Sequence, residues 1–162
     1  MNIFSNFQEI ERKFLVKTFP SEISLMESVR CERYYLFVDN YIELRIQRKG
    51  DLCELERKVV ADHAWVRDSF KAQISEKEFT ALLKSSIGNS IVFQKYSISV
   101  LPKIAIKKYE DRLHDFTLAE VEFETLEDAM KFTPLEWMGE DVSHEAYARD
   151  SGLIYLSAPP SL

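Results

Sequence analysis

Residues 9–16 read Glu9-Ile10-Glu11-Arg12-Lys13-Phe14-Leu15-Val16, a run in which Glu9, Glu11 and Lys13 stand at every second position. Successive side chains of a β-strand point to opposite faces, so the two acids and Lys13 would share one face of a strand. That face is either the water-exposed side of an antiparallel sheet, or a site where carboxylates hold a divalent metal ion and the lysine pairs with phosphate. One strand alone does not decide between these interpretations.

The composition is that of a single globular domain. The chain has 162 residues, of which 46% are hydrophobic and 30% charged. A net charge of −6 argues against broad attraction to nucleic acid or anionic membranes, although it allows a local basic pocket. No apolar run approaches the roughly 20 residues of a membrane span, and the N-terminus does not resemble a signal peptide. Cys31 and Cys53 match no disulfide scaffold or zinc motif. We therefore expect a cytoplasmic protein.

The remaining sequence predicts mostly strands with short connections. The turn sequences Lys49-Gly50-Asp51 and Leu101-Pro102 would join antiparallel neighbours. Eight strands are predicted, at residues 8–17, 32–38, 41–48, 52–60, 66–74, 91–100, 103–110 and 117–125. Helices are predicted at 75–86, 126–132 and 143–151, the first of them opening with a capping box formed by Ser75 and Glu78. This order indicates an α+β, mainly β fold and suggests a closed or nearly closed antiparallel barrel.

A charged face recurs on strand after strand. On residues 41–48, for example, Glu43, Arg45 and Gln47 alternate with apolar side chains. Two architectures fit this pattern: an open sheet with helices on its apolar side, or a barrel with helices outside and charges in its lumen. An isolated buried ion costs several kcal/mol, so a charged lumen is reasonable only if it contains water, metal and a polyanionic ligand. Periodicity alone favours the open sheet.

Three segments, taken together, resemble the CYTH family, also called triphosphate tunnel metalloenzymes. Residues 9–15 are similar to the family's N-terminal Glu-x-Glu-x-Lys signature, and residues 119–123 to its C-terminal Ala-Glu-x-Glu strand. Residues 137–143, followed by Tyr147, are similar to the segment that closes the domain. The resemblance covers nearly the whole chain. It implies one domain over residues 1–156, with residues 157–162 as a loose tail.

The resemblance also implies the fold and the chemistry. Family members form an eight-stranded antiparallel closed β-barrel, a tunnel with helices packed outside, and bind a linear triphosphate with Mg²⁺ or Mn²⁺. The implied catalytic and metal-binding residues are Glu9, Glu11, Glu120 and Glu122. The implied substrate-binding residues are Lys13, Arg45, Lys58 and Lys95. We add Lys71 and Lys107 as substrate-binding residues that are not implied by the resemblance and would stand in for lost positive charge.

Several positions depart from the family pattern. They are Gln47 and Ser97 in place of arginines, Ser69, Lys71 and Gln73 on a strand that usually carries glutamates, and Lys107 near an expected acid. Lysines in place of acids invert the local charge, which disfavours a second divalent cation there. One carboxylate cluster would remain.

Three functional hypotheses follow, in order of preference. The first is a metal-dependent triphosphate phosphohydrolase that uses Mg²⁺ or Mn²⁺ at one site. The second is a CYTH module that binds triphosphate, polyphosphate or a nucleotide without turnover. The third is a scaffold or interaction domain. An adenylate cyclase is less favoured, because the sequence offers no recognisable purine pocket. The expected partner is a small-molecule triphosphate or polyphosphate; neither nucleic acid nor membrane is expected.

Overall fold

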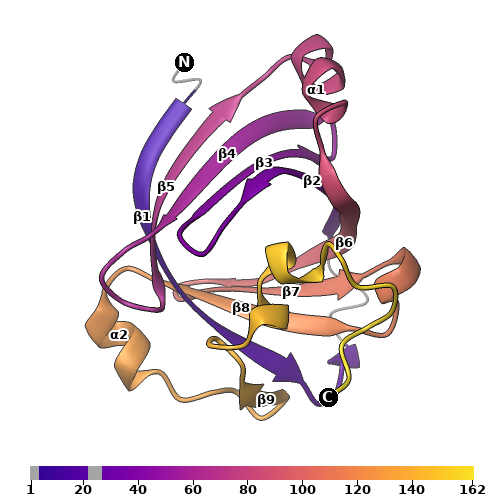
Figure 1. Cartoon of the computed structure of the whole chain (residues 1–162). Coiled ribbons are helices and arrows are strands. Elements are labelled where there is room, and N and C mark those ends of the chain that lie inside the picture. The colour runs from indigo at the N-terminus through magenta and orange to yellow at the C-terminus, as the bar shows by residue number, and fades with distance from the viewer. Residues whose placement is uncertain (1–3, 22–26) are drawn as a thin grey trace.

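The computed structural model describes residues 4–21 and 27–162 of the chain. Its strands form a single antiparallel sheet in the order β5-β4-β3-β2-β6-β7-β8-β1-β9. They are β1 (Phe4–Val16), β2 (Ser28–Val38), β3 (Ile42–Lys49), β4 (Leu52–Val60), β5 (Val66–Gln73), β6 (Ile87–Val100), β7 (Lys103–Tyr109), β8 (Thr117–Phe123) and β9 (Met138–Asp141). β1 also pairs with β5, so eight strands close into a barrel whose strands curve around a common interior (Figure 1). The predicted closed barrel is confirmed.

All eight predicted strands are present, with some differences at their ends. β1, β2 and β6 each begin four residues before the predicted start. The added part of β6, from Ile87 to Ser90, contains glycine, asparagine and serine, residues that are typical of turns. β9 was not predicted, because its four residues include Gly139 and two acids and show no clear period. Its pairing with the last residues of β1 makes it a strand.

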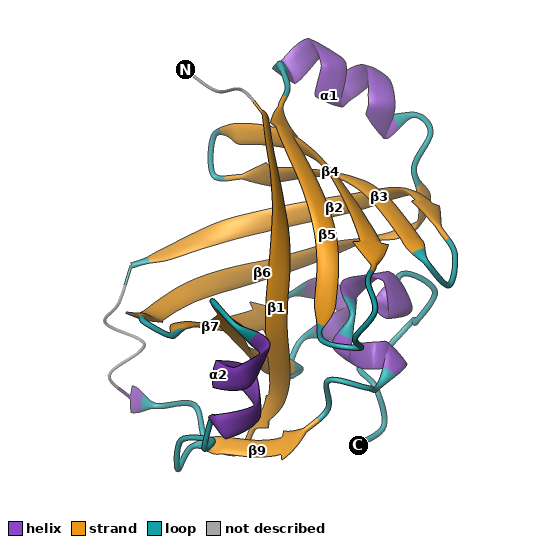
Figure 2. Ribbon diagram, turned by 90° about the vertical axis from the view of Figure 1, so that its left-hand side faces the viewer, coloured by secondary structure: helices purple, strands orange, loops and turns teal. Residues whose placement is uncertain are grey.

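Two helices cover the outside of the barrel, as predicted (Figure 2). α1 (Glu76–Leu83) begins with the predicted capping box: the Ser75 hydroxyl oxygen accepts from the Glu78 backbone N–H, and the Glu78 carboxylate accepts from the Ser75 backbone N–H. Its Phe79 packs against the outer faces of β3 and β4. α2 (Leu126–Lys131) starts at Thr125 and lies against β1 and β8. None of the helices in the described part of the chain is long and apolar enough to cross a membrane.

The predicted helix at residues 143–151 is wrong. Two short 3₁₀ turns, η3 (Ala146–Ala148) and η4 (Asp150–Leu153), occupy this region, with Arg149 in extended conformation between them. Ser143 cannot cap a helix, because its hydroxyl oxygen accepts a hydrogen bond from the Lys13 backbone N–H at 2.9 Å. The chain then folds back so tightly that a Cβ atom on Gly152 would lie 2.0 Å from the carbonyl oxygen of Ala146. Only glycine fits at that position.

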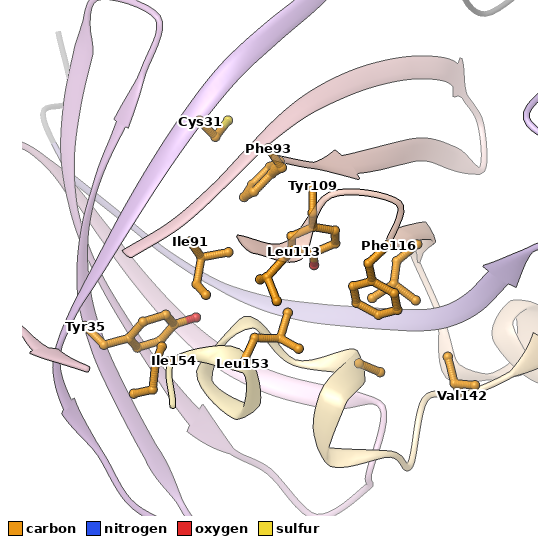
Figure 3. Close-up of a cluster of buried hydrophobic side chains, with 12 residues drawn as sticks. Cys31, Tyr35, Ile91, Phe93, Tyr109, Leu113, Phe116, Val142, Leu153 and Ile154 are labelled. Atoms are coloured by element: carbon orange, nitrogen blue, oxygen red, sulfur yellow. The ribbon is translucent and has the colours of Figure 1, made fainter. Parts of the chain in front are cut away.

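The apolar faces of most strands point outward. Phe14, Ile104 and Val121 belong to one cluster on the outside, together with Met138 of β9. The main exception is one end of the barrel, where apolar residues face inward and meet the C-terminal turns. Tyr35, Phe93 and Tyr109 from the strands pack there with Leu153 and Ile154 from the end of the chain (Figure 3). One end of the barrel is therefore partly filled, while the rest of the lumen is charged.

Arg12, on the outer face of β1, ties three elements together. Its Nε and one terminal nitrogen donate to Asp141 of β9 at 2.9 and 2.7 Å, and its other terminal nitrogen donates to the carbonyl oxygens of Ala129 and Phe132 beside α2. The guanidinium also lies 4.9 Å from the ring centroid of Trp65. Arg12 thus fixes β9 and α2 on the barrel, and takes no part in the lumen.

We predict that Arg12→Met lowers the free energy of unfolding by about 2–3 kcal/mol, because it leaves a carboxylate and two carbonyl oxygens without their donor. Urea unfolding of the purified protein measures this. Arg57→Met is the matched control, since Arg57 is exposed on β4, and it should change the free energy by no more than about 0.5 kcal/mol. Equal effects of the two substitutions would contradict this role for Arg12.

Candidate functional site

The lumen contains a cavity of about 130 Å³ with a strongly charged lining. The basic lining residues are Lys13, Arg33, Arg45, Lys49, Lys58, Arg67, Lys71, Lys95, Lys103, Lys107 and Arg149. The acidic ones are Glu9, Glu11, Glu43, Glu56, Glu120, Glu122 and Asp150. Eleven positive and seven negative charges leave a surplus of four positive charges inside a chain whose net charge is −6. This local surplus makes the lumen a site for an anion.

Three carboxylates gather on neighbouring strands. Glu11 of β1 lies opposite Glu122 of β8, and Glu9 follows on the same face of β1. One carboxylate oxygen from each lies within 4.8 Å of the others. Carboxylate oxygens are the ligands that Mg²⁺ prefers in proteins and that also suit Mn²⁺. The donor set therefore fits one such ion, and we call Glu9, Glu11 and Glu122 the three-acid group.

Each member of the three-acid group also has a lysine partner. Glu9 is paired with Lys58. The Glu11 carboxylate lies 3.0 Å from the Lys13 ammonium, and that of Glu122 lies 2.8 Å from Lys103. Burial alone would raise the pKa of Glu9, but the ammonium of Lys58 outweighs burial and holds this pKa at about 2. Glu9 is therefore ionised at neutral pH.

Glu120, the fourth predicted metal ligand, is not brought into the three-acid group. Its carboxylate lies 2.7 Å from Lys107, 3.7 Å from Lys13 and 4.0 Å from Lys95. Burial favours the neutral acid, but these lysines together hold the pKa of Glu120 well below its usual range. Glu120 serves as the shared counter-ion of three lysines here, and its role as a metal ligand stays a prediction.

Arg45 and Lys58, both predicted substrate contacts, lie in one buried network. The Arg45 Nε donates to Glu56 at 2.8 Å, and one terminal nitrogen donates to the Tyr35 hydroxyl at 3.1 Å. Burial would lower the pKa of Lys58, but the charges of Glu9 and Glu56 raise it above its usual value. Both cations are thus charged at neutral pH; Glu56 holds Arg45 in place, and Glu9 holds Lys58.

Lys107 and Lys71, at positions that depart from the family pattern, have different surroundings. Lys107 is fully buried between Glu120 and Asp150, whose oxygens lie 2.7 and 3.0 Å from its ammonium. Burial lowers the pKa of Lys107 despite these partners. The side chain of Lys71 is one third exposed and lies 3.8 Å from Glu56. Both lysines line the cavity, and their role as substrate contacts stays a prediction.

The other departures from the family pattern differ in burial. Gln47 is buried and donates to Glu54 at 2.6 Å. Ser69 is also buried, and its hydroxyl has no hydrogen-bond partner within the described part of the chain. Gln73 and Ser97 are exposed. The resemblance implies an arginine at the position of Gln47. In the structure an arginine of the neighbouring strand β2 lies beside Gln47.

That arginine is Arg33 of β2, which the sequence analysis missed. Its Nε donates to Gln47 at 2.8 Å, and its guanidinium pairs with Asp150. Alternation on β2 could have indicated Arg33, since Cys31 and Arg33 line the cavity and the Tyr35 hydroxyl accepts from Arg45. However, Arg30 and Glu32 make the opposite face of β2 equally polar. Asp150 was also missed, because it comes from a 3₁₀ turn that carries no periodic signal.

Comparisons with known proteins place the chain among its relatives. No family model matches it. The inorganic triphosphatase of Nitrosomonas europaea is 30% identical over 155 residues, which cover 93% of this chain and 99% of that protein. A crystal structure of an inorganic triphosphatase is 29% identical, covers 94% of this chain and 97% of its own, and superposes with a TM-score of 0.65.

A Hippeastrum protein with a dominant triphosphatase activity is 16% identical over 75% of this chain and 82% of its own, with a TM-score of 0.52, which shows a shared fold alone. The closed eight-stranded barrel with a charged lumen and the identity to the Nitrosomonas enzyme over almost its full length lead to one conclusion. The chain belongs to the CYTH family of triphosphate tunnel metalloenzymes.

Proposed function

We propose that this protein is a metal-dependent phosphohydrolase that binds a linear triphosphate inside the barrel and hydrolyses it. The observation that carries this proposal is the surplus of four positive charges in the lumen directly beside the three-acid group. A linear triphosphate is a narrow, strongly negative chain that would compensate the surplus. The relatives named as triphosphatases support the same reaction class.

The substrate would bind along the cations that point into the lumen. Arg33 and Arg45 offer planar guanidinium groups that match two phosphate oxygens at once. Lys13, Lys58 and Lys95 add point charges. Ion pairs already hold most of these side chains in place. The electrostatic field at the binding site is therefore set before the substrate binds, and these side chains need little rearrangement during the reaction.

The divalent cation would be held by Glu9, Glu11 and Glu122, with Mg²⁺ or Mn²⁺ as the expected ion. The bound ion would neutralise negative charge on the phosphate oxygens and make a water molecule bound to it more acidic. Glu9 and Glu11 are the present partners of Lys58 and Lys13. When the carboxylates turn to the cation, the two ammonium groups become available for phosphate. Metal and triphosphate should therefore strengthen each other's binding.

The distribution of charge in the lumen favours one bound divalent cation over two. Lys71 and Lys107 contribute positive charge where a second cation would need carboxylates. The buried Ser69 offers only a hydroxyl. A catalytically inactive module that binds triphosphate is the second candidate function, and the pairing of every carboxylate of the three-acid group with a lysine is the observation that favours it.

Substitution of the three-acid group should separate these two functions. We predict that Glu9→Gln and Glu122→Gln each reduce kcat/KM for tripolyphosphate by about 10²-fold or more, because each removes a negative ligand from the metal site. Phosphate release with Mg²⁺ or Mn²⁺ is the measurement. Glu124→Gln is the control, since Glu124 is exposed just beyond β8. Tight binding of tripolyphosphate by the wild type without phosphate release would favour the inactive module.

The basic side chains of the lumen should determine the affinity for tripolyphosphate. We predict that Lys95→Gln weakens tripolyphosphate binding about tenfold, because it removes one charged donor from the lumen while leaving Glu120 with two other lysines. Isothermal titration calorimetry without metal measures the dissociation constant. Lys84→Gln removes the same charge from the exposed end of α1 and should leave the affinity unchanged. A similar loss in both variants would show a general charge effect in place of a lumen site.

A further inference from the structure

A carboxylate of the chain itself occupies one end of the charged lumen. Asp150, the first residue of η4, lines the cavity and is almost fully buried. Its Oδ1 accepts from the Lys107 ammonium at 3.1 Å and from the Tyr109 hydroxyl, and its Oδ2 accepts from Lys107 at 3.0 Å and from the Arg33 guanidinium. Charged donors of this kind pair with carboxylate and phosphate oxygens alike. Asp150 therefore stands where a phosphate group could otherwise be held.

Asp150 is ionised although it is buried. Burial alone would raise the pKa of its carboxyl group, but the charges of Lys107 and Arg33 hold this pKa well below its usual range. The Tyr109 hydroxyl stays protonated, because burial and the charge of Asp150 raise its pKa well above the usual value. At neutral pH this end of the lumen thus contains a full negative charge that belongs to the protein.

The C-terminal turns hold Asp150 firmly in place. Leu153 and Ile154 are buried among aromatic side chains of the strands (Figure 3). Arg112 donates to the carbonyl oxygens of Leu153 and Leu156 at 2.9 and 2.7 Å. A ligand could displace Asp150 only by breaking this packing, so the carboxylate is a fixed part of the lumen.

The side chains on the inner face of β7 show where Asp150 stands relative to the three-acid group. Lys103, the first residue of β7, pairs with Glu122 of that group. Lys107 follows on the same face, and Tyr109, the last residue of the strand, packs against the C-terminal turns. A polyphosphate that extends from the three-acid group along this wall therefore reaches the Asp150 carboxylate at its far end.

Charge is balanced at this end of the lumen. Arg33 and Lys107 are paired with Asp150 and Glu120, so these residues together carry no net charge. The surplus of four positive charges belongs to the other lining residues. Because a guanidinium carries several N–H donors, Arg33 can also contact the last phosphate group of a triphosphate. A further group beyond it would meet the Asp150 carboxylate without a local surplus of positive charge to offset the repulsion.

We propose that Asp150 is a specificity-determining residue that limits the length of the polyphosphate that the lumen accepts. Its carboxylate occupies the place between Arg33 and Lys107 that a fourth phosphate group would take. The lumen then holds all of a tripolyphosphate, whereas the last group of a tetrapolyphosphate finds no place in it. The role of Asp150 as a length limit rests on the proposed function, because it requires that the triphosphate bind along the lumen.

A comparison of two ligands on the wild type tests this limit without any substitution. Isothermal titration calorimetry without metal measures the dissociation constants of tripolyphosphate and tetrapolyphosphate. We expect tetrapolyphosphate to bind no more than about threefold tighter than tripolyphosphate, because its additional group gains no contact with the lumen cations. A larger gain in affinity would overturn the proposal.

The variant Asp150→Asn removes the charge and keeps the shape of the side chain. We expect it to bind tetrapolyphosphate about tenfold or more tighter than the wild type does, and tripolyphosphate no more than about threefold tighter, because the fourth phosphate group replaces the lost carboxylate. Asp115→Asn, the same change on a side chain that is 91% exposed, should bind both ligands like the wild type. An equal gain for both ligands in Asp150→Asn, or weaker binding of both, would overturn the proposal.

Two further readouts keep the outcomes apart. Asp150→Asn removes one member of a buried ion-pair cluster, so thermal unfolding must first show that the variant folds. If it does not fold, the comparison of ligands on the wild type decides alone. If the wild type binds neither ligand, the proposed function fails and the length limit fails with it. If it binds both and gains strongly from the fourth group, only the length limit fails. Absence of phosphate release would refute turnover alone, since calorimetry still reports binding.

Discussion

The constraint on which the structure depends is the compensation of charge inside a closed barrel. Burying a charged side chain costs desolvation free energy unless an opposite charge lies beside it. In the lumen, several ion pairs that share members provide these opposite charges. The Glu56 carboxylate accepts a hydrogen bond from Arg45, and Lys58, also on β4, forms an ion pair with Glu9 on β1. Glu120 similarly joins lysines of three different strands. These pairs connect the two sides of the barrel while leaving a positive surplus for a ligand.

The same alternation that fills the lumen with charge builds the hydrophobic core on the outside. With polar side chains turned inward, the apolar faces need cover, and α1, α2 and β9 provide it. Arg12 holds two of these covering elements on the strand whose other face carries Glu9, Glu11 and Lys13. The outer packing and the inner site thus meet on β1, a strand that pairs with β5, β8 and β9 and carries Glu9 and Glu11 on its inner face.

Alternation along single strands placed Glu9, Lys58 and Lys107 on the charged face of their own strands without any knowledge of the partners. The resemblance to the family was needed to predict that these faces line the lumen of a barrel. Alternation could not distinguish Glu120 from Glu122, because both lie on the same face of β8. The register decides between them: Glu122 lies opposite Glu11 and joins the acids, whereas Glu120 lies opposite Lys13 and joins the lysines. Strand register is a property of the assembled sheet.

Residues that lie outside a clear strand alternation could not be assigned to the site from the sequence. Arg33 stands on a strand with polar side chains on both faces, so its direction depends on which strands flank β2. Asp150 begins the 3₁₀ turn η4, and Arg149 precedes it in extended conformation. Neither position carries a periodic signal, and the C-terminal turns reach the barrel interior through the packing of Leu153 and Ile154 (Figure 3). The resemblance to the family indicated a closed barrel but not that its C-terminal segment contributes charges to the cavity.

The central claim is that the surplus positive charge and the three-acid group together hold a triphosphate and one divalent ion. Anomalous diffraction from crystals soaked with Mn²⁺ and a non-hydrolysable triphosphate tests it most directly. We predict one manganese peak between Glu9, Glu11 and Glu122, with phosphate groups lying along Arg33, Arg45 and Lys58. Manganese bound elsewhere, or a triphosphate outside the lumen, would contradict the claim.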